Sequence, residues 1–200
     1  MNPPTAAAQA QLRLREGNDR FVSHNRDQSK PPGRDDQRPF AIILGCSDSR
    51  VPPEKIFDQG FGDLFVVRVA GNIAGPTQIA SVEFAASQFG TRLVVVLGHS
   101  QCGAVLATLE QLEGETHQAF PNTHPIIEFI RPAVESLLFT ELADDREALV
   151  RHAVRANVEA SVERLRRSEG LKRLIDEDGL AVMAAMYSLE TGRVEFFDDR

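Results

Sequence analysis

The sequence predicts an α/β fold with a mostly parallel central β-sheet flanked by helices, an N-terminal helical arm and a C-terminal edge strand or hairpin. Three short apolar runs, rich in β-branched residues, are typical of strands buried on both faces of a parallel sheet: residues 40–44, 64–69 and 93–97. Segments with helical spacing of apolar residues separate these runs and follow them. Nothing in the composition of the 200 residues suggests a second domain, so we expect one domain over 1–200, with an arm and loop at 1–38 and an α/β core at 39–200.

The arm is expected to contain an amphipathic helix over residues 5–24. Thr5 suits the N-cap position, and the apolar positions include Ala10, Leu14 and Phe21. Residues 29–38 are rich in Pro, Gly and charged side chains, which predicts a loop. We expect the apolar side of this helix to pack on another surface.

The helices and the closing strands are predicted from spacing and from turn residues. A crossover helix is indicated by apolar residues at helical spacing before Gly90, which suits a C-terminal cap: Ile79, Val82, Ala86 and Phe89. A second helix is expected over 102–114, followed by an exposed connection over 115–125. The clearest stripe predicts one long helix that packs on the sheet: Val150, Val154, Val158, Val162 and Leu165. Residues 180–187 and 193–197 flank a turn at 190–192, which indicates the closing hairpin or edge strand.

Charge and hydropathy exclude several classes of partner. Lys and Arg number 22 against 29 Asp and Glu, a net charge of -7, so nucleic acid and anionic membranes are poor partners. No apolar run approaches the roughly 20 residues that span a bilayer, and the N-terminus lacks a signal-peptide pattern. We therefore expect a cytoplasmic protein with no membrane partner.

The two cysteines of the chain each follow a predicted strand. Cys46 comes after the first strand and Cys102 shortly after the third, with His99 three residues before it. Because ligands bind at the carboxyl ends of strands in open α/β sheets, these side chains are expected to converge. Two thiolates and one imidazole form a catalytic type of zinc site whose fourth position stays open. The alternatives are a disulfide, which a reducing compartment disfavours, and two ordinary core cysteines.

Local features of the two motifs favour metal binding. Cys46 and Cys102 each stand where a loop is expected to become a helix, and helix N-terminal amides stabilise a thiolate. Gly98 and Gly103 are expected to let the backbone bend closely around the ion.

Asp48 and Arg50 flank Ser49 in the loop after Cys46. Their opposite charges favour a bidentate ion pair, or Asp48 leaves Arg50 and becomes the fourth zinc ligand. The first arrangement opens the site to water, and the second closes it.

The segments Cys46-Ser47-Asp48-Ser49-Arg50-Val51-Pro52 and Gly98-His99-Ser100-Gln101-Cys102-Gly103 resemble the signature of the β-class carbonic anhydrases. The resemblance implies a single catalytic domain in which Cys46, His99 and Cys102 bind one Zn²⁺ ion and Asp48 and Arg50 form a switchable pair. It also implies that Gln37 hydrogen-bonds the substrate and that Phe65 lines the pocket. Family members are homodimers, often paired into homotetramers, with the N-terminal helix wrapping a neighbour and active sites at the interface.

The activity implied by the resemblance is the reversible hydration of carbon dioxide to bicarbonate and a proton by zinc-bound hydroxide. One alternative is hydrolysis of carbonyl sulfide or carbon disulfide, since family relatives use the same ligand set on these linear molecules. Another alternative is a catalytically silent zinc-binding module. A thiol redox protein is the least favoured alternative, because His99 and Asp48 suit metal binding better than thiol exchange. The presence of Asp48, Arg50 and Gln37 together favours the enzyme.

Overall fold

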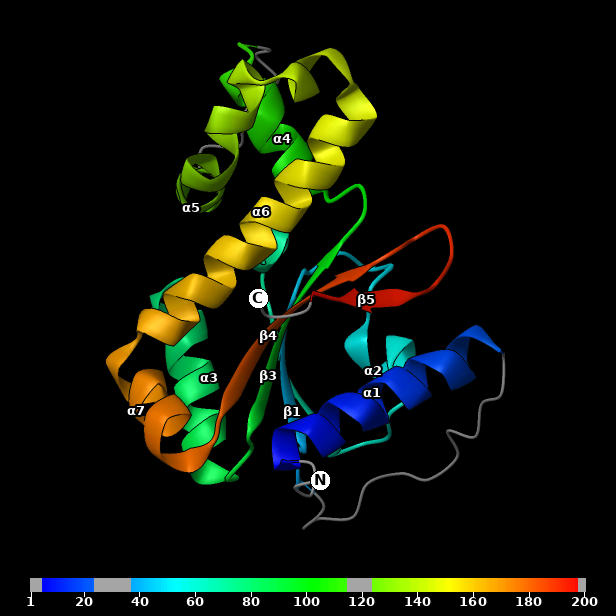
Figure 1. The fold of residues 1–200 in the computed structure, drawn as a ribbon, viewed down its shortest axis with the longest axis vertical. Coiled ribbons are helices and arrows are strands. Elements are labelled where there is room, and N and C mark those ends of the chain that lie inside the picture. The colour runs from blue at the N-terminus through cyan, green and yellow to red at the C-terminus, as the bar shows by residue number, and fades with distance from the viewer. Residues whose placement is uncertain (1–4, 24–36, 115–123, 198–200) are drawn as a thin grey trace.

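The structure is a computed structural model of the 200-residue chain and describes residues 5–23, 37–114 and 124–197. Its centre is a five-stranded sheet with the order β2-β1-β3-β4-β5 (Figure 1). The strands are β1 (Ala41–Gly45), β2 (Leu64–Arg68), β3 (Leu93–His99), β4 (Ala181–Tyr187) and β5 (Val194–Phe196). β1 to β4 run parallel and β5 pairs antiparallel with β4, which confirms the predicted mostly parallel sheet with a closing hairpin.

Helices of very different length surround the sheet. They are α1 (Ala6–Val22), α2 (Pro53–Ile56), α3 (Pro76–Gln88), α4 (Gly103–Leu112), α5 (His124–Val134), α6 (Arg146–Arg167) and α7 (Glu169–Asp178). Three 3₁₀ segments complete the described elements: η1 (Ala70–Asn72), η2 (Glu135–Phe139) and η3 (Glu141–Asp144). The predicted connection over 115–125 ends earlier than expected, because α5 begins at His124; residues 115–123 lie outside the described part of the chain.

The two central strands are buried along their whole length. Every residue of β1 and β3 is buried, as expected for apolar strands covered on both faces. Successive side chains enter different cores, so that Ile43 and Val95 belong to one core while Ile42 and Val94 belong to the other. This central position of β1 and β3 brings their carboxyl ends side by side.

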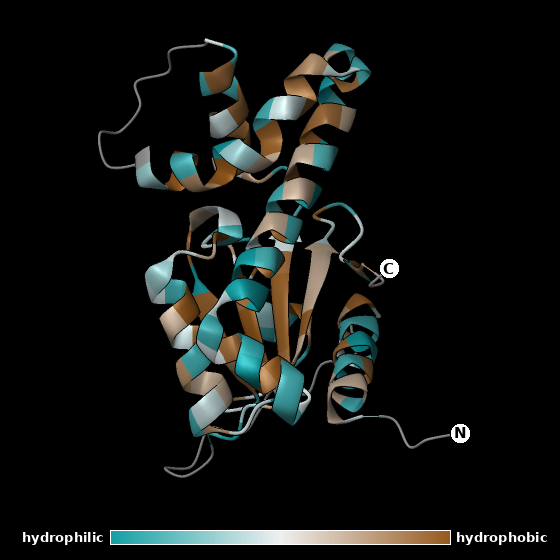
Figure 2. Cartoon of the chain, turned by 60° about the vertical axis from the view of Figure 1, so that its left-hand side comes forward, coloured by the Kyte–Doolittle hydropathy of each residue, from teal (hydrophilic) through white to brown (hydrophobic). Residues whose placement is uncertain are grey.

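The helices form layers on both faces and a cap beyond the carboxyl ends of the strands. α3, α7 and the C-terminal half of α6 cover one face, and α1 and α2 lie on the other (Figures 1 and 2). α4, α5 and the N-terminal half of α6 pack together beyond the carboxyl ends of β1 and β3. The stripe predicted for the long helix is buried in α6, where Val154, Val158 and Leu165 are at most 1% exposed.

The N-terminal helix docks on its own chain. The hydroxyl of Thr5 accepts a hydrogen bond from the amide of Ala8, which confirms the predicted N-cap, and Leu14 is fully buried in the core. The side-chain amide of Asn18 donates to the carbonyls of Ile56 and Gly192, and its oxygen accepts from the amide of Val194. In this structure the surface that buries the arm is therefore the sheet and α2 of the same chain. No helix in the described residues is long and apolar enough to cross a membrane.

Candidate metal centre

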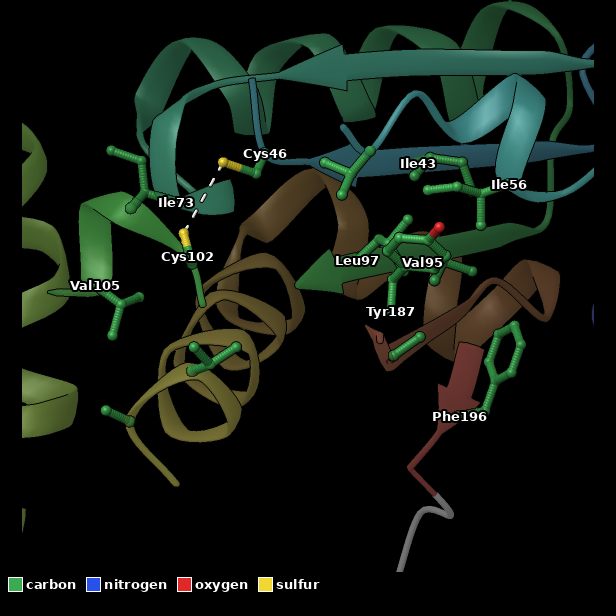
Figure 3. Close-up of a cluster of buried hydrophobic side chains, with 14 of the residues drawn as sticks. Ile43, Cys46, Ile56, Ile73, Val95, Leu97, Cys102, Val105, Tyr187 and Phe196 are labelled. Carbon is green, nitrogen blue, oxygen red and sulfur yellow. Dashed lines mark hydrogen bonds between the residues drawn. The ribbon is translucent and has the colours of Figure 1, made fainter. Parts of the chain in front are cut away.

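The carboxyl ends of β1 and β3 bring three potential metal ligands together. Cys46 directly follows β1, His99 is the last residue of β3, and Cys102 is the N-cap of α4. The ligand atoms of these three residues all lie within 4.8 Å of one another, and all three residues are buried. Figure 3 shows the two sulfur atoms facing each other, and they are 4.0 Å apart.

The donor set and its geometry fit a zinc ion. Two thiolates at about 2.3 Å from a tetrahedral zinc ion lie about 3.8 Å apart, close to the observed 4.0 Å. His99 Nδ1 lies 2.9 Å from the carbonyl of Ser100, to which it donates as an N–H, so Nε2 is the nitrogen left to bind a metal. Nε2 is buried and has no hydrogen-bond partner among the described residues. An orphaned buried nitrogen beside two thiols is costly for a protein, and a metal ion at this point satisfies it.

Ser100, whose carbonyl accepts the hydrogen bond from His99, is itself held by the end of β4 and by the turn that follows it. The amide of Ser100 donates to the carbonyl of Tyr187, and the hydroxyl of Ser100 accepts from the amide of Leu189. Ser100 is therefore held on three sides, which sets the orientation of the imidazole ring. Ser100 belongs to the second cysteine motif, but nothing in the sequence indicates its contacts with Tyr187 and Leu189, which lie almost 90 residues away.

The turn from β3 to α4 brings Cys102 to the cluster. Gln101 has a φ of +54°, a left-handed conformation that folds the chain back within two residues of His99. Cys102 is the N-cap of α4, as predicted for a thiol at a helix N-terminus, and the nearby amides of Ala104 and Val105 act to lower the pKa of its thiol, although its sulfur makes no cap hydrogen bond. The same expectation was wrong for Cys46, because α2 begins only at Pro53.

The two motif glycines have roles that differ from the predicted close bend around the ion. A β carbon on Gly98 would lie 2.4 Å from Cγ2 of Val158, so this glycine lets α6 approach the sheet. A β carbon on Gly103 meets nothing within 4 Å, and its φ is not positive. Neither glycine is therefore required by the metal cluster itself.

The two cysteine side chains differ in their readiness to ionise. The neighbouring Cys102 thiol, then His99 and the amides of Asp48 and Gly71, lower the pKa of Cys46 to about 4 against the effect of burial. The Cys46 sulfur and burial raise the pKa of Cys102 above its ordinary range, because two adjacent thiolates repel each other. The pair therefore resists a second ionisation, and a divalent cation offsets the repulsion that opposes it.

Asp48 and Arg50 form the bidentate pair rather than the alternative in which Asp48 joins the ligands. Arg50 donates to Asp48 from Nε at 2.9 Å and from Nη2 at 2.6 Å, and its backbone amide adds a third bond at 2.9 Å. These bonds hold the pKa of Asp48 well below its usual range. Asp48 Oδ2 is nevertheless only 3.9 Å from His99 Nε2, so the carboxylate borders the cluster while Arg50 retains it.

Two residues that sequence reasoning did not connect with the metal hold the loop after Cys46. Arg68, at the end of β2, donates to the carbonyls of Cys46 at 2.9 Å and Asp48 at 2.6 Å. Gly71 donates its amide to Cys46 Sγ at 3.3 Å from a left-handed conformation with φ +71°. The one signal in the sequence was their position at the carboxyl end of an apolar run: Arg68 is the last residue of β2, the strand that neighbours β1, and Gly71 follows three residues later.

Gln37 and Phe65 are not brought to the cluster of their own chain. Gln37 is exposed before the N-terminal end of β1, separated from Cys46 by the whole strand, a span of about 16 Å at 3.3 Å per residue. Phe65 pairs in register with Ile42 and packs with Phe84 and Phe89 on the face of the sheet that carries α3. The structure of a single chain therefore assembles the predicted metal ligands and the ion pair but not these two residues.

The comparisons with known proteins agree with one another. A family model described as carbonic anhydrase matches residues 41–194. A protein named carbonic anhydrase 2 from Mycobacterium tuberculosis is 36% identical over 206 residues, which cover 98% of this chain and 95% of that protein. A carbonic anhydrase from Mycolicibacterium smegmatis is also 36% identical and covers 96% of this chain and 92% of its own.

Solved structures share the fold. One of two tetrameric β-carbonic anhydrases from Sordaria macrospora superposes with a TM-score of 0.70 at 28% identity, over 82% of both chains. A β-carbonic anhydrase of Aspergillus fumigatus gives a TM-score of 0.73 at 28% identity, over 81% of this chain and 76% of that one. With a matched family model over most of the core and a Cys-His-Cys cluster at the ends of β1 and β3, this chain belongs to the β-carbonic anhydrase family of enzymes.

Proposed function

We propose that this chain catalyses the reversible hydration of carbon dioxide to bicarbonate and a proton at a zinc ion held by Cys46, His99 and Cys102. The observation that carries the proposal is the buried His99 Nε2, which lacks a partner among the described residues and lies beside two thiols 4.0 Å apart. Zinc held by three protein ligands would lower the pKa of a bound water molecule and so supply a hydroxide nucleophile, and the charge of the two thiolates would favour activity on the basic side of neutrality.

Asp48 has two tasks in this proposal, and Arg50 makes both possible. While Arg50 binds both carboxylate oxygens, Asp48 stays outside the ligand cluster and leaves the fourth position to water and substrate. The same pairing keeps Asp48 ionised, so its oxygen 3.9 Å from His99 Nε2 is able to accept a hydrogen bond beside the reacting water. Loss of the Arg50 contact frees Asp48 to occupy the fourth position and close the site.

The test is stopped-flow hydration of carbon dioxide by the zinc-loaded protein between pH 7 and 9, with turnover of carbonyl sulfide measured alongside. We expect zinc-dependent hydration far above background and a large loss in Asp48→Asn. Arg151→Gln, which removes an exposed arginine of an ion pair on α6, is the control for loss of a surface charge. A zinc-loaded, folded protein with no hydration above background refutes the proposal.

We also propose that Gln37 and Phe65 act in the site of a second copy of this chain. β2 is an edge strand, and its outer edge has no partner strand in the described residues. Antiparallel pairing of two β2 edges about a two-fold axis places the N-terminal end of one strand beside the C-terminal end of the other. The beginning of one subunit's β2, where Phe65 lies, then approaches the ligands that follow β1 in its partner.

Mixed dimers test this arrangement directly. Gln37→Ala and Cys46→Ala each impair their own homodimers, one in substrate binding and one in metal binding. After subunit exchange, action across the interface restores about a quarter of the wild-type activity, since half of the dimers are mixed and each holds one intact site. No recovery after verified exchange contradicts the proposal, because Gln37 then acts within its own chain.

A further inference from the structure

α6 carries two buried polar side chains on a face that is otherwise apolar. Asn157 and Ser161 are fully buried, although the neighbouring positions Val154, Val158 and Val162 belong to the core. A buried amide costs free energy unless it is hydrogen-bonded, so a polar side chain in this stripe calls for a specific partner.

The partner of Asn157 is the loop that touches the metal cluster. Asn157 Nδ2 donates a 2.8 Å hydrogen bond to the carbonyl of Gly71, which is 86 residues earlier in the sequence. Gly71 in turn donates its amide to Cys46 Sγ at 3.3 Å. Two successive hydrogen bonds thus connect the middle of α6 with one of the predicted zinc ligands.

Gly71 depends on this support because its own conformation is special. Its φ of +71° is left-handed, and a β carbon there would lie 2.8 Å from Cδ1 of Ile130 and 3.1 Å from the β carbon of Ala104. The next residue, Asn72, is also left-handed with a φ of +44°. Asn157 is the described side chain that binds the Gly71 carbonyl, so it anchors this peptide in a turn that backbone hydrogen bonds at Val69 and Asn72 also hold.

We propose that Asn157 is a positioning residue of the metal centre: by holding the Gly71 carbonyl, it keeps the Gly71 amide aimed at Cys46 Sγ. An N–H donor at a thiolate withdraws negative charge from sulfur and fixes the direction of its lone pairs, which strengthens the preference for one ligand geometry. Asn157 acts through Gly71 and touches neither substrate nor metal. This inference rests on the proposed zinc site.

The test compares Asn157→Leu, which keeps a similar volume but removes the donor, with Val162→Ala on the same helix. Val162 is buried in the stripe and has no polar contact, so its truncation controls for loss of packing. Each protein is loaded with Co²⁺ to record the thiolate-to-cobalt charge-transfer band, and with Zn²⁺ to measure release to a chelator.

We expect Asn157→Leu to shift the charge-transfer band to longer wavelength, because a thiolate without its N–H donor is richer in electrons. Zinc release is expected to accelerate by about 10- to 100-fold, as for other groups that orient a metal ligand. Val162→Ala is expected to keep the wild-type band. Identical bands and release rates in the two variants overturn the inference, whereas a wild-type protein that binds no zinc overturns the proposed function instead.

A second variant and a measurement on the unaltered protein keep the test decisive if Asn157→Leu does not fold. Asn157→Ala removes the same donor without adding branched methyl groups, and the same band shift is expected. In the wild-type protein loaded with ¹¹³Cd, we expect scalar coupling between cadmium and the Gly71 amide proton through Cys46 Sγ, and slow exchange of that proton. A Gly71 amide that lacks coupling and exchanges freely overturns the inference without any substitution.

Discussion

Gly98 precedes His99, a proposed zinc ligand, yet the structure assigns this glycine a role in helix packing. In Gly98→Ala the new β carbon would lie 2.4 Å from Cγ2 of Val158 and 3.4 Å from Cγ1 of Val154. Carbon atoms in contact are about 3.5 to 4.0 Å apart, so the first contact is too short by more than about 1 Å. Val158 is fully buried and β-branched on a helix, so rotation of its side chain does not relieve the overlap.

The expected cost follows from how such an overlap is relieved. α6 or β3 must shift, and overpacking of this kind costs about 1 to 3 kcal/mol of the free energy of unfolding. Val158→Ala removes two buried methyl groups and costs about 2 kcal/mol alone, from about 0.8 kcal/mol per group and a cavity contribution. In the double variant the new methyl group of Gly98→Ala occupies the space that the Val158 side chain vacates. The loss of unfolding free energy in the double variant is therefore expected to be about 1 to 2 kcal/mol smaller than the sum of the losses in the two single variants.

Urea unfolding of the two single variants and the double variant, at one protein concentration, measures this coupling. Gly103→Ala is the matched control from the same motif: nothing lies within 4 Å of its β carbon, so stability is expected to be unchanged or about 1 kcal/mol higher. Strictly additive costs, or a Gly103→Ala variant as unstable as Gly98→Ala, would refute the assignment of Gly98 to α6 packing.

Three further outcomes are expected. Zinc removal by a chelator is expected to abolish hydration. It is also expected to make both buried cysteines, Cys46 and Cys102, reactive towards a thiol reagent that labels neither of them in the zinc-loaded protein. Labelling of either cysteine in the zinc-loaded protein contradicts the ligand assignment. In the zinc-free protein, Arg50→Gln returns the pKa of Asp48 towards its ordinary value. Since the lowered pKa stabilises the fold above about pH 4 and this stabilisation is lost on acidification, the urea midpoints of the zinc-free variant and wild type should differ at pH 7 and converge in acid. Leu14→Ala costs about 2 to 5 kcal/mol because Leu14 is fully buried, and a loss below about 1 kcal/mol in urea unfolding would show that α1 leaves its own sheet.

Local patterns predicted most of the fold because the physics that sets them is local. The apolar runs became β1, β2 and β3, the valine stripe is buried in α6, and Thr5 caps α1. The meeting of Cys46, His99 and Cys102 was also predictable, since parallel neighbouring strands end at the same edge of a sheet.

The supporting contacts were not predictable because they depend on which distant segments become neighbours. Arg68 reaches Cys46 because β2 pairs with β1, and Asn157 reaches Gly71 because α6 crosses near the end of β3. The expected helix N-terminus at Cys46 was wrong because α2 begins seven residues later. No local pattern tells that Gly98 faces a valine of α6.

The contacts of Asn18 have a consequence for the order in which the molecule forms. Besides Ile56, this side chain binds Gly192 and Val194, so it joins α1 to residues that lie more than 170 positions later in the chain. α1 precedes the other described helices in the chain, but it completes its docking only after the β4–β5 hairpin exists, because such long-range contacts require the intervening chain. Until that moment the apolar side of α1 that contains Leu14 is available to other surfaces, among them the same sheet on a finished copy of this chain.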